Sequence, residues 1–274
     1  MMSVSSLLSA RYGQQAPAVP EAWSPLLDQL LTHRSVRHHL PDPVSDAQLT
    51  AIVAAAQSAA SSSNLQPWSV IAVRDPVARA RLAELAGDQA HVAQAPLVLV
   101  WLADLARLEA VAQAEGLTHD ALDYLEMGLV GVIDAALAAQ NAMAAAESLG
   151  LSGCYIGGIR NHPESVAELL GLQPRVFAVF GMTLGQEDPA QSASVKPRLP
   201  QAAVLHHERY RPVAEQQAAI ASYNEAMAAF YAQQQMKVRG TWTVHSGKRV
   251  ATPEALTGRD RLQAALQALG FPLK

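Results

Sequence analysis

The chain has 274 residues, of which 50% are hydrophobic, and its 20 Lys and Arg against 24 Asp and Glu give a net charge of −4. This balance provides no electrostatic footprint for nucleic acid or for an anionic membrane surface. Cys154 is the only cysteine, which excludes an intramolecular disulfide and a thiolate metal site and fits a reducing cytoplasm.

The first 23 residues give no clear secondary-structure signal. Their short apolar run is interrupted by serines, and no basic stretch precedes it as in a signal peptide. Pro17 and Pro20 mark the end of this stretch. We therefore expect residues 1–23 to be a loose N-terminal extension.

Helix-start signals recur along the chain. An amphipathic helix begins at Ser24-Pro25, a capping box at Ser45-Asp46-Ala47-Gln48 opens a helix to about residue 60, and Asp75-Pro76 starts one that ends near Gly87. Further helices are predicted over 121–149, 163–170, 212–234 and 253–269. Four apolar runs predict buried strands: 68–73, 96–101, 154–156 and 176–182.

The helix predicted over 121–149 carries Ala, Gly and Met around most of its circumference, which implies burial on nearly all sides. Its most apolar part, Leu129 to Ala146, contains Asp134, Gln140 and Asn141, so we do not expect a membrane span. A central helix within a domain or a dimer fits this pattern.

Strands and helices interleave without a repeat, which predicts an α+β or α/β fold with helices on both faces of a sheet. We expect three parts: the extension at 1–23, a core at 24–212, and a strandless helical arm at 213–274 that packs on the core or on a partner subunit.

Residues 33–38, HRSVRH, place two Arg and two His in a chain that is poor in charge. Because the guanidinium fork fits clustered anionic oxygens, this segment suggests an anion site. The alternative is a solvated helix end in which the cations compensate the helix dipole.

A second basic segment, Val195 to Pro200, holds Lys196 and Arg198 on either side of a proline, as a phosphate clamp or an exposed linker. A third, Lys237 to Trp242, is basic and aromatic and is either an anion site or a mobile loop.

Two polar loops complete the candidate segments. Ser61 to Gln66 offers small donors and acceptors, either for a ligand or as a capping loop. Gly153 to Asn161 pairs two glycines after a strand, which allows close backbone approach to a flat ligand or a plain turn. It lacks the third glycine of a dinucleotide-binding fingerprint.

No side chain stands out as catalytic, and the histidines at 91, 119, 162, 206 and 207 have no metal-ligand spacing. We therefore expect neither a catalytic side chain nor a metal site. If the chain is an enzyme, a cofactor carries the chemistry.

Five motifs recur here in an order that resembles the FMN-dependent nitroreductase and flavin-reductase family, in particular its major oxygen-insensitive, NADPH-preferring branch. They are HRSVR, SSSNLQ, GDQAHVAQAP, GCYIGGIRN and KPRLP, spread over residues 26–212. The resemblance implies a homodimer with a three-layer α+β sandwich, a mostly antiparallel sheet and the long helix at the dimer interface.

The resemblance also implies which residues bind the cofactor. His33, Arg34 and Ser35, with Lys196 and Arg198, are expected at the FMN phosphate and ribityl chain, and Arg37 at the pyrimidine edge of the flavin. Further FMN contacts are expected from Ser61, Ser62, Ser63, Gln89, Tyr155, Ile156, Gly157 and Gly158. Arg160 and Arg239 are expected at the NADPH phosphates.

The implied activity is ping-pong transfer of hydride from NADPH or NADH through flavin N5 to nitroaromatics, quinones or related electrophiles, by a cytoplasmic enzyme. Alternatives are flavin, azo or chromate reduction on the same fold, a non-catalytic FMN-binding protein, and an FMN-free helical interaction protein.

Overall fold

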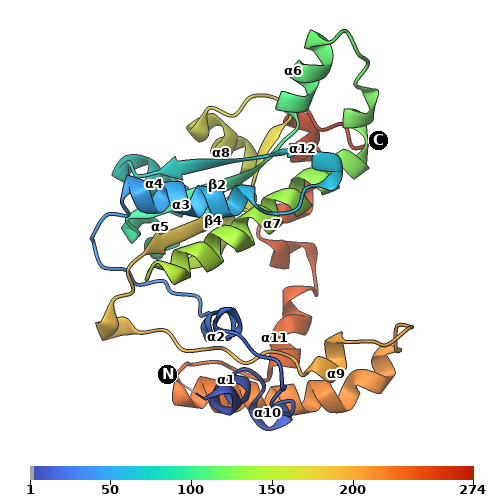
Figure 1. Ribbon diagram of the computed structural model, residues 1–274. Helices are drawn as coiled ribbons and strands as arrows, with labels where there is room; N and C mark the ends of the chain where they lie inside the picture. Colours follow the sequence, from blue (N-terminus) through green and yellow to red (C-terminus); the bar gives the residue numbers. More distant parts are fainter. Residues whose placement is uncertain (1–2) are drawn as a thin grey trace. The chain divides into compact units, whose positions relative to one another are not determined.

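The computed structural model describes residues 3–274 and divides into two compact units (Figure 1). The first unit combines the chain up to Arg34 with Ala193–Leu256, and the second combines Ser35–Ser192 with Thr257–Lys274. This division differs from the boundaries expected at 24–212 and 213–274, because the last residues of the chain belong to the sheet-containing unit.

The second unit is built on a four-stranded antiparallel sheet with the strand order β1-β2-β4-β3. The strands are β1 (Trp68–Val73), β2 (Leu97–Asp104), β3 (Ser152–Ile156) and β4 (Val176–Gly185). In register, Val70 pairs with Trp101 and Cys154 pairs with Thr183. The four strands predicted from apolar runs are confirmed.

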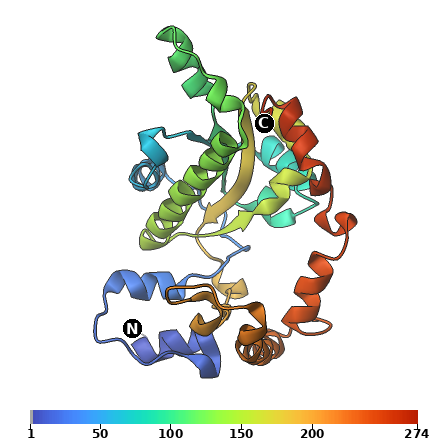
Figure 2. The ribbon, with the colours of Figure 1, turned by 90° about the vertical axis from the view of Figure 1, so that its right-hand side faces the viewer.

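Helices cover both faces of the sheet, which confirms the three-layer α+β arrangement (Figures 1 and 2). Alternate residues of the fully buried β2 point to opposite faces. Val98, Val100 and Leu102 pack in a cluster with α4 (Pro76–Leu85) and α8 (Pro163–Leu170). Leu97, Leu99 and Trp101 pack in a cluster with α3 (Asp46–Gln57) and α7 (Leu125–Ser148).

Local capping sets the starts of two of these helices. The Ser45 hydroxyl accepts from the Gln48 amide at 3.2 Å, and the Gln48 side chain accepts from the Ser45 amide at 3.0 Å. Asp75 accepts from the Ala78 amide at 2.7 Å. Both predicted helix starts are confirmed, since these side chains satisfy amides that have no partner within the helix.

The long helix α7 has two different faces. One is buried and rich in alanine, whereas Leu125, Leu129, Ile133 and Leu137 on the other are 43–54% exposed. The expectation of burial on nearly all sides is therefore wrong for the single chain. By length and composition alone α7 is apolar enough to cross a membrane, but half of its most apolar stretch is buried inside the protein, and buried core helices pass the same test.

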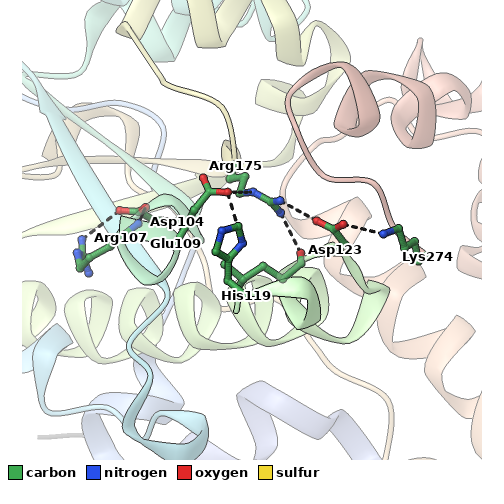
Figure 3. A network of polar contacts seen from close by, with 8 residues as sticks. Asp104, Arg107, Glu109, His119, Asp123, Arg175 and Lys274 are labelled. Carbon is green, nitrogen blue, oxygen red and sulfur yellow. Dashed lines mark hydrogen bonds and ion pairs between the residues drawn. The ribbon is translucent and has the colours of Figure 1, made fainter. Parts of the chain in front are cut away.

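The C-terminal residues pack on the sheet unit, which also contains α5 (Ala90–Gln94), α6 (Ala106–Ala114) and α12 (Leu262–Ala268). The buried ring of Phe271 meets Phe177 edge to face, with 5.3 Å between centroids. In Figure 3, Asp123 accepts from both Arg175, at 2.7 Å, and Lys274, at 2.8 Å. These bonds hold the chain end against the segment that precedes α7.

The first unit is helical. It comprises α1 (Val4–Tyr12), α2 (Pro25–Thr32), α9 (Gln201–Val204), α10 (Gln217–Gln233) and α11 (Trp242–Arg249). Its apolar cluster centres on Tyr223, Met227 and Phe230 of α10. The helix α1 lies where the sequence predicts a loose segment.

Candidate cofactor site

The basic segment at 33–38 leaves α2 and becomes extended at His33, the C-cap residue. Ser35 forms a parallel bridge with Gly153, and the Val36 amide donates to the Gly153 carbonyl at 2.9 Å. Val36 is buried, while Ser35 and Arg37 are exposed. Because side chains alternate along an extended chain, Ser35 and Arg37 share the face opposite to Val36.

The second basic segment, Lys196-Pro197-Arg198, runs through the first unit without regular secondary structure. The hydroxyl of the buried Tyr223 donates to the Pro197 carbonyl at 3.1 Å. The Lys196 ammonium lies 5.9 Å from the centroid of the Phe230 ring. These contacts with α10 fix the path of the segment, so that it is more than an exposed linker.

His33 and Lys196 are brought together by a residue that sequence analysis does not single out. The guanidinium of Arg11, in α1, donates to the backbone carbonyls of both His33 and Lys196. The first unit therefore places the basic segment after α2 beside the Lys196-Pro197-Arg198 segment. No local sequence signal indicates this, because 185 residues separate Arg11 from Lys196.

The serine loop between α3 and β1 is tied to α7. The Ser61 hydroxyl donates to the buried Asp134 carboxylate at 2.6 Å and accepts from the Gln66 amide at 2.8 Å. Its one proton is thus committed to the protein, and Ser61 acts first as a support for the loop. Ser63 and Asn64, with φ of 48° and 56°, adopt left-handed backbone, a strained state that occurs often in binding loops.

The end of β3 carries four predicted cofactor residues. Ile156 is buried in the core, so it can offer a ligand little beyond its backbone. The Tyr155 ring lies edge to face with Phe180, 5.4 Å between centroids, and its burial raises the pKa of the phenol. Tyr155 therefore stays neutral and presents a partly buried ring.

The two glycines after β3 differ in what surrounds them. A methyl group on Gly158 would lie 2.2 Å from the Ala86 carbonyl oxygen and 2.6 Å from the Gln89 amide nitrogen, which itself donates to Ala86 at 2.7 Å. A methyl group on Gly157 would meet nothing closer than 3.7 Å. Close packing within the protein therefore requires Gly158, and Gly157 alone has an open side.

Two guanidinium groups flank Gly157. The nearest atoms to a methyl group there are Arg160 Nη2, at 3.7 Å, and Arg259 Nη1, at 3.9 Å. Arg160 also donates to the Val179 carbonyl, and burial, followed by the charge of Arg259, lowers the pKa of its guanidinium. Arg259 is not among the predicted residues, because it comes about a hundred residues after the glycines.

The remaining predicted residues are Arg239 and Gln89. Arg239 is exposed in the first unit, between α10 and α11. Gln89 is the N-cap residue of α5, the helix that contains His91. Burial lowers the pKa of His91, and the positive charge of Arg37 lowers it further. Among residues 3–274 no group of His, Cys, Asp and Glu side chains is arranged to hold a metal.

Comparison with known proteins identifies the family. The nitroreductase family model matches residues 30–186, and that of the nitroreductase C-terminal domain matches residues 196–274. An oxygen-insensitive NADPH nitroreductase of Salmonella typhimurium is 45% identical, over 81% of this chain and 89% of the relative. A chromium(VI) reductase of a Pseudomonas species is 41% identical, over 74% of this chain and 82% of the relative.

Among solved structures, the NADPH:FMN oxidoreductase of Vibrio harveyi, complexed with NAD⁺, superposes with a TM-score of 0.80 and 35% identity. The match covers 92% of this chain and 100% of that one. The two family models, the sequence identities and the shared fold lead to one conclusion: the chain belongs to the nitroreductase family.

Proposed function

We propose that the first unit carries residues for the phosphate of FMN, namely His33, Arg34, Lys196 and Arg198. The protein is an oxidoreductase that uses FMN with NADPH or NADH as electron donor. The observation that carries the phosphate assignment is the joining of His33 and Lys196 within one unit. Imidazole, ammonium and guanidinium groups are the donors that a phosphate dianion requires.

The residues present fit FMN. The open side of Gly157 leaves room for a flat group beside the end of β3, and Tyr155 lies in that strand two residues before Gly157. Ser62, Ser63 and Gln89 are polar and can bond to hydroxyl or ring-edge atoms. Ser61 contributes through the loop that it stabilises, and Ile156 contributes through its backbone.

When bound, FMN supplies the chemistry by accepting a hydride from the nicotinamide and passing it to the acceptor. Arg37 holds a permanent positive charge on the exposed face that it shares with Ser35, where it stabilises negative charge that develops on the pyrimidine edge of a flavin. No side chain needs to act as a general acid in hydride transfer, so we assign no catalytic residue.

We assign Arg160 and Arg239 to the phosphates of the nicotinamide cofactor. Arg160 lies beside Arg259, which strengthens an anion-binding role for this end of β3. Arg239 is exposed in the segment between α10 and α11 of the first unit.

We propose that the acceptors are nitroaromatics, quinones or related electrophiles. The 45% identical relative is named a nitroreductase, but the 41% identical one is named a chromium(VI) reductase. Chromate or flavin reduction is therefore the second candidate function. A panel of nitrofurazone, a benzoquinone, chromate and free FMN under NADPH separates these, with kcat/KM as the measure.

The exposed apolar face of α7 supports a homodimer. A row of Leu and Ile at every fourth residue is costly to leave in water and is typical of a helix that packs on a partner. We propose that this partner is a second copy of the chain, and that the protein works in the cytoplasm without nucleic acid or membrane partners.

The experiment that tests the function needs only the purified protein. Bound FMN gives a yellow preparation with an absorbance band near the flavin maximum, and anaerobic NADPH should bleach it. A colourless preparation that takes up no FMN contradicts the proposal. A yellow one that neither NADPH nor NADH bleaches indicates a flavin-binding protein without reductase activity.

A further inference from the structure

The N-terminal helix α1 lies outside both family models, which begin at residues 30 and 196. It nevertheless packs as an ordered part of the first unit. The Ser3 hydroxyl caps it by accepting from the Ser6 amide at 3.2 Å, and Leu7 and Leu8 are buried. In Figures 1 and 2 α1 lies close to α10. A methyl group added to Gly13, the residue after α1, would lie 3.4 Å from the Cβ atom of Ala226 in α10.

Arg11, in the last turn of α1, is only 6% exposed. Its Nη2 donates to the Leu31 carbonyl at 2.6 Å and to the His33 carbonyl at 2.9 Å, and its Nη1 donates to the Lys196 carbonyl at 3.0 Å. One guanidinium thus joins the end of α2 to the Lys196-Pro197-Arg198 segment. A planar fork with several fixed donors can span two backbone segments, which a single ammonium cannot do in the same way.

The backbone of Arg11 also contacts the Lys196-Pro197-Arg198 segment. Its carbonyl accepts from the Arg198 amide at 2.8 Å. Arg11 therefore bonds to the main chain of His33, Lys196 and Arg198, three of the four residues that we assign to the FMN phosphate. Their backbone positions determine where the three cationic side chains begin.

We infer that Arg11 is a positioning residue for the phosphate group of the cofactor, acting through the backbones of His33, Lys196 and Arg198. The inference rests on the proposed phosphate assignment of those residues. It gives the N-terminal segment a role in cofactor selection: it favours a flavin that carries a terminal phosphate over one that lacks it.

The test compares FMN with riboflavin, which has the same ring and ribityl chain and no phosphate. Dissociation constants of both are measured on apo-protein by quenching of flavin fluorescence, for the natural protein and for Arg11→Met and Arg11→Lys. Arg211→Lys is the matched control, because Arg211 is in the same unit and its guanidinium donates to the backbone carbonyls of Ala202 and Leu205 instead of those of the predicted phosphate residues.

We expect Arg11→Met to raise the dissociation constant of FMN about tenfold, equal to about 1.4 kcal/mol, and to change that of riboflavin by less than about twofold. Arg11→Lys should lie between Arg11→Met and the natural protein, and Arg211→Lys should match the natural protein. An equal loss for both flavins, or no loss for either, overturns the inference, because a purely structural brace does not distinguish them.

The paired variant Lys196→Ala/Arg198→Ala separates this inference from the function on which it rests. If that variant keeps the natural preference for FMN, the phosphate assignment itself is wrong. If it loses the preference and Arg11→Met and Arg11→Lys keep it, only the role of Arg11 is wrong.

Hydrogen exchange on the natural protein tests the inference without a variant, should both substitutions at Arg11 prevent folding. FMN, added at saturation, should slow amide exchange in 7–13 and at Arg198 more than riboflavin does at saturation. Equal protection by the two flavins contradicts a link between α1 and the phosphate.

Discussion

The buried carboxylate of Asp134, on α7, accepts a 2.6 Å hydrogen bond from the hydroxyl of Ser61, 73 residues earlier in the chain. It also lies 3.5 Å from the Ser62 amide. The loop that we assign to the flavin is thus fixed by the same helix whose opposite face is exposed and apolar.

Replacing Asp134 should loosen that loop. In Asp134→Ala the Ser61 hydroxyl and the Ser62 amide lose their acceptor, at a cost of about 1–3 kcal/mol in the free energy of unfolding. FMN affinity should fall as well. Urea denaturation and flavin titration measure the two effects. Ser58→Ala serves as the control, since the exposed Ser58 hydroxyl donates to the Ala54 carbonyl one turn earlier in α3. Unchanged stability in Asp134→Ala contradicts the argument.

The two glycines after β3 make a matched pair. Gly158→Ala forces a methyl group to 2.2 Å from the Ala86 carbonyl, so we expect a loss of about 1–3 kcal/mol in stability from overpacking. Gly157→Ala meets only ordinary contacts, so stability should be nearly unchanged while FMN affinity falls. Thermal unfolding with and without FMN distinguishes the pair. Equal destabilisation by both substitutions argues against the assigned roles.

Removing the charge of Arg37 should affect both binding and turnover. We expect Arg37→Ala to raise the FMN dissociation constant about tenfold and to lower kcat, because the developing negative charge on the ring loses its cation. Arg81→Ala is a suitable control, since Arg81 pairs only with the nearby Glu84 on an exposed helix surface. Tight flavin binding and full activity in Arg37→Ala refute the role of Arg37.

Acid should weaken the attachment of the C-terminus shown in Figure 3. Hydrogen bonds from Lys274 and then from Arg175 lower the pKa of Asp123 from 3.8 to about 2. A lowered folded-state pKa stabilises the fold above about pH 4, and this contribution is lost as the pH falls towards 2. Tm measured from pH 6 to pH 2 should therefore fall less steeply in Asp123→Asn. Asp42→Asn, at an exposed position, should follow the natural protein.

A charge on the exposed face of α7 should prevent dimerisation. Ile133 is 54% exposed at the middle of the Leu and Ile row, and Ile133→Glu would place a carboxylate in the proposed interface. Sedimentation should find a dimer for the natural protein and a monomer for this variant. Val111→Glu, at a similarly exposed residue of α6, should remain dimeric. A monomeric natural protein excludes the proposed assembly.

Sequence patterns predicted the sheet and many helix boundaries because their signals are local. Ser45 and Asp75 cap the helices that they were expected to start, and β1 and α8 have the predicted bounds. The helix α1 was not predicted because serines interrupt the helical periodicity of its apolar residues. Leu7 and Leu8 are nevertheless buried within the first unit.

The residues that support the site were harder to predict. The roles of Arg11, Asp134 and Arg259 arise from contacts with residues far away in the chain, which no spacing rule reveals. The paired glycines had a local signal, but only the packing of Ala86 against Gly158 shows that one of them serves the fold.

The order of the two units along the chain constrains when the protein can fold on the ribosome. The sheet unit needs Phe271, whose ring is buried against Phe177, but Phe271 is synthesised only after Ala193–Leu256 of the other unit. Strands β1 to β4 must therefore wait with an incomplete hydrophobic core while about 80 further residues are translated, which takes roughly 4–16 seconds at about 5–20 residues per second. During that interval the ring of Phe177 lacks the aromatic partner that covers it in the folded protein.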